Sequence, residues 1–361
     1  MRPDETSAVG AGAAGDAETA RAAAGGGLAG ARAPLPDYPR ARDLGGGVAV
    51  IDTLHHGHPG TIGVFVVDLP RGGRALVESG PGVTVPEVLA GLAALGLEPR
   101  DVTHLLLTHI HLDHAGAAGA LAGLTGATVY VHEVGAPHLV DPSRLMASAF
   151  RVYGDALRHL WGEMVPLPQA QVVAVRDGDV LDVGGLAVRV AHTPGHASHH
   201  VSYLLPDGTL FCGDSAGVVL PGASVIRPAL APPELDIELK EASVAKQLAL
   251  EPTRLVLSHF GPVPDAEAHL RAYPGVMRAW EAELLEGLAA GEDDDALAAR
   301  MRAFEDAELG REGVPDGIAH RYRLTSDAAM NAAGLKRYLT KLRPDRVAAA
   351  RGGASAGGGE A

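Results

Sequence analysis

The spacing of hydrophobic positions changes repeatedly between about residue 39 and residue 264. Short apolar runs rich in β-branched residues alternate there with longer stretches in which apolar residues recur at helical intervals. This alternation predicts an α/β fold of stacked sheet and helix layers. We expect strands at 63–68, 74–78, 103–108 and 128–132, within 172–193, and at 201–205, 209–213 and 254–258, and helices at 85–95, 115–122, 143–164 and 237–250.

The pattern changes after Pro264, where charged helical stretches follow one another at 266–289, 294–308 and 326–342. Both ends of the chain are rich in Ala and Gly and offer little to pack. We therefore expect four parts: a disordered leader (1–38), a main α/β domain (39–264), a helical C-terminal region (265–345) and a disordered tail (346–361).

Composition narrows the classes of function. A net charge of -14 argues against nucleic acid as a partner, because phosphate binding requires clustered Lys and Arg. No apolar run reaches the roughly 20 residues of a membrane span, and the leader lacks the apolar core of an export signal. Cys212 is the only cysteine, so an intramolecular disulfide is impossible. We expect a cytoplasmic protein that acts on a small-molecule substrate, with no nucleic acid and no membrane partner.

The strongest chemical signal is a cluster of three imidazoles and a carboxylate directly after the strand predicted at 103–108. It comprises His109, His111, Asp113 and His114. Residues two apart in an extended segment project to the same side, so His109 and His111 can reach one cation. Asp113 and His114 follow where the chain turns into a helix, and they can serve a neighbouring ion. Neutral imidazole and carboxylate suit zinc, with iron or manganese as substitutes.

Three further ligand candidates lie at the ends of other predicted strands. His196 closes the segment His192-Thr193-Pro194-Gly195-His196, Asp214 follows the hairpin, and His259 follows the strand at 254–258. Because each follows an apolar run and precedes a loop, all three can converge on one edge of a sheet.

The order of these motifs resembles the metallo-β-lactamase superfamily from about Gly47 to Pro262, with most likeness to hydrolases of the glyoxalase II and lactonase type and to a little-characterised prokaryotic subgroup. The resemblance implies a four-layer αββα sandwich with a C-terminal helical extension, and makes residues 39–264 the catalytic domain. It also implies two Zn2+ per chain. One metal is then held by His109, His111 and His196, the second by Asp113, His114 and His259, and Asp214 bridges them.

The implied activity is metal-dependent hydrolysis of a small carbonyl compound, such as a thioester, lactone or other ester, by a hydroxide held between the metals. Asp113 is the expected catalytic residue, since it both binds a metal and orients the hydroxide. An alternative of another class is a persulfide dioxygenase with a single iron, held by His109, His196 and Asp214. No basic motif for glutathione is evident, and β-lactam hydrolysis is disfavoured by the missing export signal.

Several residues outside the ligand set stay open. Glu78 stands where many superfamily members carry the Asp of an Asp-Thr-Gly motif, which puts the geometry of its support to a ligand in doubt. The histidines at 55, 56 and 58 are expected in a loop at the rim of the site, and whether His199 or His200 supports a ligand is left open. The C-terminal helices could cap the site or contact a second subunit of a homodimer.

Overall fold

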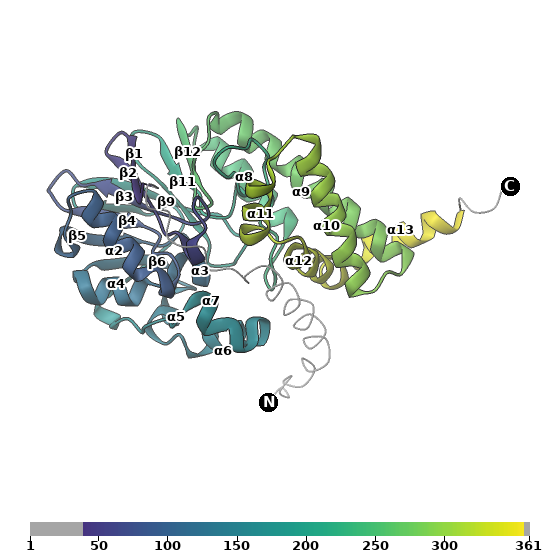
Figure 1. Cartoon of the computed structure of the whole chain (residues 1–361), viewed down its shortest axis with the longest axis horizontal. Helices are drawn as coiled ribbons and strands as arrows, with labels where there is room; N and C mark the ends of the chain where they lie inside the picture. The colour runs from purple at the N-terminus through teal and green to yellow at the C-terminus, as the bar shows by residue number, and fades with distance from the viewer. Residues whose placement is uncertain (1–38, 357–361) are drawn as a thin grey trace.

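A computed structural model describes residues 39–356. Two mixed β-sheets form its centre (Figure 1). The first sheet has the order β1-β2-β3-β4-β5-β6-β7, and the second has the order β13-β12-β11-β10-β9-β8. The strands of the first sheet are β1 (Ala41–Gly45), β2 (Val48–Asp52), β3 (Gly63–Asp68), β4 (Arg74–Val77), β5 (Val102–Leu106), β6 (Thr128–His132) and β7 (Val172–Val175). Those of the second are β8 (Val180–Val183), β9 (Leu186–His192), β10 (Val201–Leu204), β11 (Thr209–Phe211), β12 (Arg254–Leu257) and β13 (Gly261–Pro262).

The inner faces of the two sheets share one apolar core. Phe65 of β3 and Phe211 of β11 meet there with ring centroids 5.5 Å apart, and Tyr203 of β10 donates its hydroxyl to the carbonyl of Leu107 at 3.0 Å. Strands β4 to β7 run parallel to one another, so the loops that follow β4, β5 and β6 emerge at the same edge. This edge receives the cluster predicted after β5.

Helices cover the outer face of each sheet, which completes four layers. The helices beside the first sheet include α2 (Val85–Ala94), α4 (Ala118–Thr125) and α5 (Ala136–Val140), and their apolar residues join one core with β5 and β6. On the second sheet, α8 (Ile237–Ala249) and α9 (Ala266–Ala290) share a core with β11 and β12. The predicted αββα sandwich with a C-terminal helical extension is confirmed.

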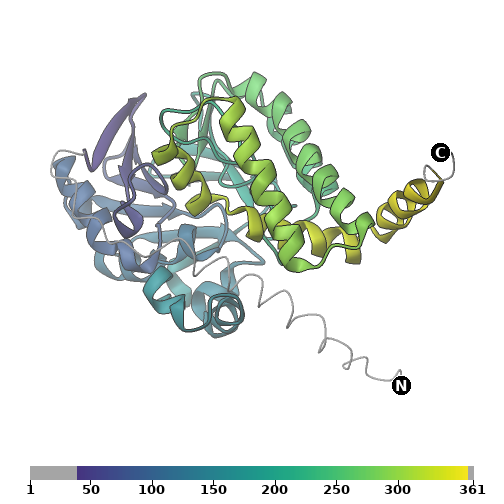
Figure 2. The ribbon, with the colours of Figure 1, turned by 45° about the vertical axis from the view of Figure 1, so that its right-hand side comes forward.

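The C-terminal extension contains α10 (Asp294–Arg311), α11 (Asp316–Thr325), α12 (Ala328–Lys341) and α13 (Pro344–Ala356). Figure 2 shows α9 and α10 as two long helices lying side by side. The pattern did not predict α11, and it predicted a disordered tail from residue 346 where α13 continues to residue 356. Val347 packs into the core of the second sheet's helices, and Arg346 pairs with Glu281 of α9, so this last helix has partners that the local composition does not reveal.

The long helix expected at 143–164 is broken into α6 (Ser143–Tyr153), a short 3-10 turn η4 (Gly154–Ala156) and α7 (Leu157–Trp161). Gly154 ends α6 with a φ of 55°, a conformation that favours glycine. In Figure 1, α6 and α7 lie together below the sheets, at the side where α3 (Leu112–Ala115) begins.

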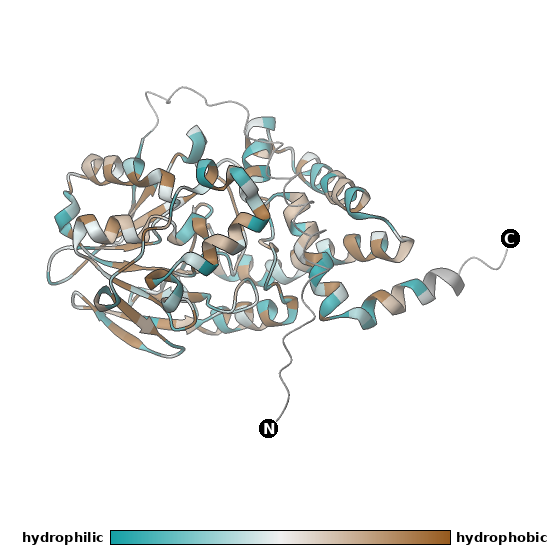
Figure 3. Cartoon of the chain, turned by 90° about the horizontal axis from the view of Figure 1, so that it is seen from below, coloured by the Kyte–Doolittle hydropathy of each residue, from teal (hydrophilic) through white to brown (hydrophobic). Residues whose placement is uncertain are grey.

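Apolar residues run along the strands and alternate with polar residues along the helices, as Figure 3 shows from below. Within residues 39–356, no helix combines the length and the apolar character needed to cross a membrane. The predicted leader (1–38) and the end of the predicted tail (357–361) lie outside the described residues.

Candidate metal centre

The first group of candidate ligands forms where the loop after β5 meets the loop after β9. His109 Nε2 lies 3.1 Å from His111 Nδ1, and His196 Nε2 lies 2.9 Å from the same His111 nitrogen. Zinc–nitrogen bonds of about 2.0–2.1 Å in a tetrahedron would place ligand nitrogens about 3.3 Å apart. The three nitrogens thus converge at a spacing close to that of a shared metal ion.

The second group joins the start of α3 to the end of β12. Asp113 Oδ2 lies 3.3 Å from His114 Nε2 and 3.3 Å from His259 Nε2. Both imidazoles are buried, whereas the Asp113 side chain keeps 23% of its surface exposed. Asp113 is therefore the member of this group that a small molecule can reach.

Asp214 lies between the two groups and turns one oxygen to each. Its Oδ1 is 3.4 Å from both His114 Nε2 and His259 Nε2, and its Oδ2 is 3.5 Å from His196 Nε2. The structure therefore brings together all seven residues that the sequence singled out. It also places Asp214 within 3.5 Å of imidazoles of both groups.

In each of four imidazoles, the ring nitrogen that faces away from the cluster has its own hydrogen-bond partner. His259 Nδ1 lies 2.7 Å from the carbonyl oxygen of Thr61, and His196 Nδ1 lies 3.3 Å from that of Ala229. Since a carbonyl oxygen only accepts, each Nδ1 carries the hydrogen and each Nε2 keeps a lone pair for the cluster. These two acceptors are backbone atoms, so no side-chain pattern could have predicted them.

Glu78 fixes the other two imidazoles. Its Oε1 accepts from His114 Nδ1 at 3.0 Å and from the hydroxyl of Thr108 at 2.5 Å. Because that hydroxyl gives its only hydrogen to Glu78, Thr108 Oγ1 accepts from His109 Nδ1 at 3.0 Å. The longer carboxylate at position 78, whose geometry was in doubt from the sequence, reaches one candidate ligand directly and another through Thr108.

His200 supports the cluster from the side of Asp214. Its Nε2 accepts from the backbone N–H of Asp214 at 3.1 Å, and its Nδ1 lies 2.9 Å from the hydroxyl of Thr193. A Cβ at Gly213 would lie 2.5 Å from His200 Nε2 and 2.5 Å from Thr108 Oγ1, so only glycine fits between them. The imidazoles at positions 55 and 56 lie outside the cluster and contact α7.

The charges of the cluster suit a cation. Burial raises the pKa of Asp113 and Asp214, but His114 and His259 outweigh it and hold both carboxyls well below their usual range. Burial lowers the pKa of His114, yet Asp113, Asp214 and Glu78 together raise it well above its ordinary value. Burial and the neighbouring imidazoles lower the pKa of His109, which keeps this ring neutral.

Two buried atoms in the cluster lack hydrogen-bond partners among the described residues, His114 Nε2 and Asp214 Oδ1. Such atoms cost free energy unless something satisfies them. Both face the second group, and a metal ion bound there would satisfy both. The donor set of imidazoles and ionised carboxylates fits divalent zinc, iron or manganese.

Comparison with known proteins agrees with this geometry. The family model of the metallo-beta-lactamase superfamily matches residues 58–259, which is more than half of the chain and includes all seven residues. The chain belongs to the metallo-beta-lactamase superfamily. The candidate ligands are thus the residues that the superfamily resemblance implied.

Two curated relatives are matched over only part of their own length. A metallo-beta-lactamase fold-containing protein of Sulfurisphaera tokodaii, ST1585, is 35% identical over 46% of this chain and 65% of its own. A hydroxyacylglutathione hydrolase of Rhodopseudomonas palustris is 33% identical over 42% of this chain and 47% of its own. The chain therefore spans less than two thirds of the length of these curated relatives.

Two solved structures have a fold similar to that of this chain. ST1585 from Sulfolobus tokodaii superposes with a TM-score of 0.53 at 28% identity, covering 64% of this chain and 86% of that one. The metallo-beta-lactamase family protein TTHA1429 from Thermus thermophilus gives a TM-score of 0.62 at 23% identity, covering 83% and 95%. The second likeness concerns the fold alone, and its greater coverage takes in much of the chain beyond the family match.

Proposed function

We propose that this superfamily member is a dinuclear metal-dependent hydrolase of a small carbonyl substrate, namely a thioester, a lactone or another ester. The observation that carries the proposal is the position of Asp214, which turns one oxygen to each of two complete ligand groups. The names of relatives point the same way, because hydroxyacylglutathione hydrolases cleave an acyl compound.

The metal pair, when bound, would supply a hydroxide near neutral pH and polarise the substrate carbonyl. The chain's own residues would orient the reactants. Asp113, the more exposed of the two carboxylates, would orient the hydroxide toward the substrate, which assigns it the catalytic role. The proton that the leaving group takes up would come from the attacking hydroxide by way of Asp113, or from a metal-bound water. His109, His196, His114 and His259 keep fixed tautomers through their Nδ1 partners, so they need no reorganisation during the reaction.

Metal content separates this proposal from the single-iron persulfide dioxygenase. The protein is purified without chelator, and the metals per chain are measured by elemental analysis beside His109→Ala. Two zinc ions per chain, or zinc mixed with iron or manganese, together with hydrolysis of thioesters or lactones that His109→Ala abolishes, would support the hydrolase. One iron per chain, with oxygen uptake on addition of a persulfide and no hydrolysis, would overturn it.

The remaining expectations stay predictions that accompany the proposal. They are a small-molecule substrate, the absence of nucleic-acid and membrane partners, a cytoplasmic location and a homodimer, with the role of the C-terminal helices left open.

A further inference from the structure

The loop between β2 and β3 is held in a strained conformation beside the candidate metal centre. Leu54 and His56 have φ angles of 46° and 51°, in the left-handed region that residues other than glycine seldom adopt. The carboxylate of Asp52 closes the loop by accepting from the N–H groups of Leu54 at 3.0 Å and Gly60 at 2.6 Å. Strain of this kind persists where surrounding contacts fix it, and it concentrates at binding sites.

The contacts that fix this loop come from α7. The Nε2 atoms of His55 and His56 lie 2.7 Å and 3.2 Å from the carbonyl oxygen of Leu160, so both imidazoles donate to one acceptor. The His55 ring also stacks on Trp161, with centroids 5.0 Å apart and planes 16° apart. Trp161 in turn meets the Tyr153 ring edge-on at 5.6 Å. We call these four half-buried rings, His55, His56, Tyr153 and Trp161, the ring wall.

The ring wall borders the second ligand group. Thr61, at the end of the same loop, accepts from His259 Nδ1 at 2.7 Å, which joins the loop to the metal centre. Tyr153 and Trp161 also pack against the core that contains Leu112, the residue before Asp113. A substrate whose carbonyl lies at Asp113 would therefore have part of its structure beside these rings.

The ring wall is uncharged near neutral pH. Burial lowers the pKa of His55 to about 4, and it also lowers the pKa of His56. Burial and the Asp113 charge raise the pKa of Tyr153, so its hydroxyl keeps its proton. Neutral imidazoles, a phenol and an indole favour contact with an apolar or aromatic group.

Nearby cations are already engaged elsewhere. Arg158 of α7 pairs with Glu163 and is largely exposed, and Arg151 of α6 donates to the hydroxyl of Ser148. Arg321 of α11 donates to the carbonyl oxygens of Pro59 and Pro221. Each of these three arginines therefore already has a partner within the protein.

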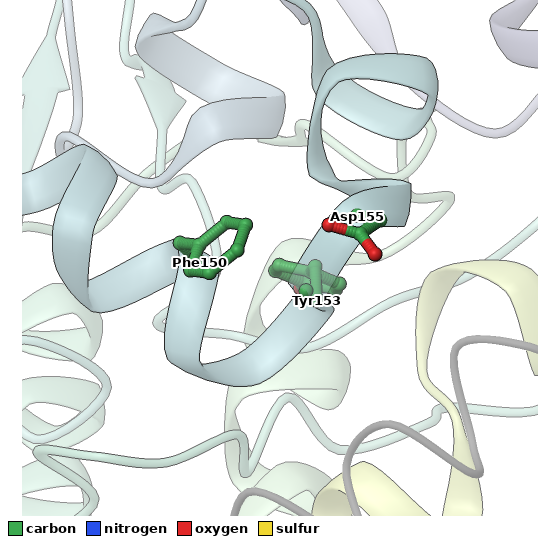
Figure 4. Close-up of a pocket in the computed structure, with 4 residues that line it drawn as sticks. Phe150, Tyr153 and Asp155 are labelled. Carbon is green, nitrogen blue, oxygen red and sulfur yellow. The ribbon is translucent and has the colours of Figure 1, made fainter.

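The ring wall continues along α6, of which Tyr153 is the last residue. An open pocket of about 320 Å³ is lined there, among the described residues, by Phe150, Tyr153, Gly154 and Asp155. Figure 4 shows the side chains of Phe150, Tyr153 and Asp155 along α6 and the turn that follows it. Phe150 is 49% exposed, and Asp155 adds negative charge beside it, which would repel an anionic group.

We propose that the ring wall, continued by Phe150, is the specificity-determining surface of this enzyme and binds an uncharged aromatic or branched apolar acyl group. This inference rests on the proposed hydrolase function. It predicts a different substrate from that of the relatives named hydroxyacylglutathione hydrolases. The part of the preferred thioester or ester that lies on this surface would be apolar and would carry no carboxylate.

Substrate selectivity tests the inference. For the zinc-loaded protein, kcat/KM is measured with a phenylacetyl thioester and with the acetyl thioester of the same uncharged thiol. Trp161→Ala is expected to lower the ratio of the two values about tenfold, because the ring wall loses the indole on which His55 stacks. Trp161→Phe keeps a ring and is expected to restore most of the ratio. The control Leu124→Ala, at an exposed apolar residue of α4, should leave it unchanged.

A binding measurement separates the failure of the inference from that of the proposed function. The chain has two tryptophans, and Trp280 is buried with its Nε1 bonded to Glu308, so ligand-dependent changes in emission should come from Trp161. A methyl benzyl ketone analogue of the substrate should quench this emission. If the ketone quenches the emission but no ester is hydrolysed, the hydrolase function is wrong and the ring wall is still supported as a binding surface. If esters are hydrolysed but Trp161→Ala has the same selectivity ratio as the wild type, and the ketone does not quench the wild-type emission, the ring wall is not the binding surface. The hydrolase function is then still supported.

Discussion

Glu78 connects both halves of the candidate metal centre through a single buried carboxylate. Beyond His114 and Thr108, its Oε1 accepts from the hydroxyl of Ser258 at 2.8 Å, and Ser258 directly precedes His259. Glu78 thus contacts two separate segments of the chain that carry candidate ligands, residues 108–114 and 258–259. Its own φ of 67° shows that the surroundings hold it in a conformation that a glutamate seldom adopts.

Replacing this carboxylate should weaken metal binding more than it weakens folding. In Glu78→Gln the side chain keeps its length, but the amide loses the charge and one of the acceptors that orient His114 and Thr108. We expect metal affinity to fall about 10- to 100-fold, as is usual when such an outer partner is lost. Competition titration with a chromophoric chelator measures the affinity. Glu267→Gln, at an exposed residue of α9, is the control, and equal affinities in the two variants would contradict the assignment.

Asp113 is predicted to matter for the reaction as well as for metal binding. Asp113→Ala removes the accessible carboxylate from the second ligand group and the group that would orient the hydroxide. We expect about one metal fewer per chain and a loss of kcat of at least about 100-fold. Elemental analysis and steady-state kinetics on one preparation measure both quantities. A variant that keeps two metals and full activity would show that Asp113 has neither role.

At the scale of the elements, helix packing near the site depends on glycines. In α4, a Cβ at Gly119 would lie 1.8 Å from the carbonyl oxygen of Val165, whereas a Cβ at Gly123 would meet nothing within 4 Å. The two positions belong to the same helix but differ in their surroundings. Gly119 lets α4 lie directly against the segment that follows α7, and Gly123 faces open space.

These two glycines form a matched pair for mutation. Gly119→Ala should destabilise the protein by about 2–4 kcal/mol, because the backbone at Val165 has to move. Gly123→Ala should stabilise it by about 0.5–1 kcal/mol, because alanine restricts the unfolded chain and favours the helix. Urea unfolding followed by circular dichroism gives both values. If Gly119→Ala proved as stable as the wild type, the close contact between α4 and Val165 would be wrong.

The sequence predicted elements well where a periodic pattern was long and bounded by turn residues. The hairpin of β10 and β11 around Pro206-Asp207-Gly208 and the helix α8 both form where expected. The expected helix over 143–164 is interrupted at Gly154, because this glycine adopts a positive φ that turns the chain away from the axis of α6. The helix α13 was missed because its stability comes from Val347 and Arg346, which contact distant segments.

The candidate site was predictable for a related reason. Its seven ligand candidates are chemically unusual residues at strand ends, so they stand out in the sequence without any tertiary information. Their supporting partners are common residues or backbone atoms, such as the hydroxyl of Thr108 and the carbonyl oxygen of Thr61. Only the folded arrangement distinguishes these partners from the many similar groups elsewhere in the chain.

At the scale of the whole molecule, a buried ion cluster joins the catalytic region to the C-terminal helices. Arg227, in the loop after Asp214, has no exposed surface and pairs with Glu305 at 2.7 Å and Glu308 at 2.9 Å, both on α10. The guanidinium also lies over the ring of Trp280 at 4.2 Å. Two atoms of the pair, Arg227 Nε and Glu305 Oε2, are buried without hydrogen-bond partners in the described part of the chain, so the cluster is costly to ionise fully.

Because ionising this cluster costs free energy, the stability with which it holds α10 depends on pH. Burial raises the pKa of Glu305 from 4.5 to about 7, although Arg227 and Arg323 act in the opposite direction. The folded protein therefore holds this proton more tightly than the unfolded chain does. The contribution of Glu305 to stability is greatest below pH 4.5 and declines as the pH rises through about 7.

Glu305→Gln tests this dependence, because glutamine resembles the protonated side chain at every pH. Between pH 5 and pH 8, the unfolding free energy of the variant should gain about 2–3 kcal/mol relative to the wild type, which is most of the free energy equivalent to the pKa shift. Urea unfolding at several pH values measures the difference in unfolding free energy between the variant and the wild type. The pH dependence of the metal centre is common to both proteins, so it cancels in this difference. Glu312→Gln, at an exposed residue just after α10, should run parallel to the wild type. Parallel behaviour of Glu305→Gln would instead mean that Glu305 is ionised beside Arg227 throughout this range, and that the C-terminal helices are held by a permanent ion pair.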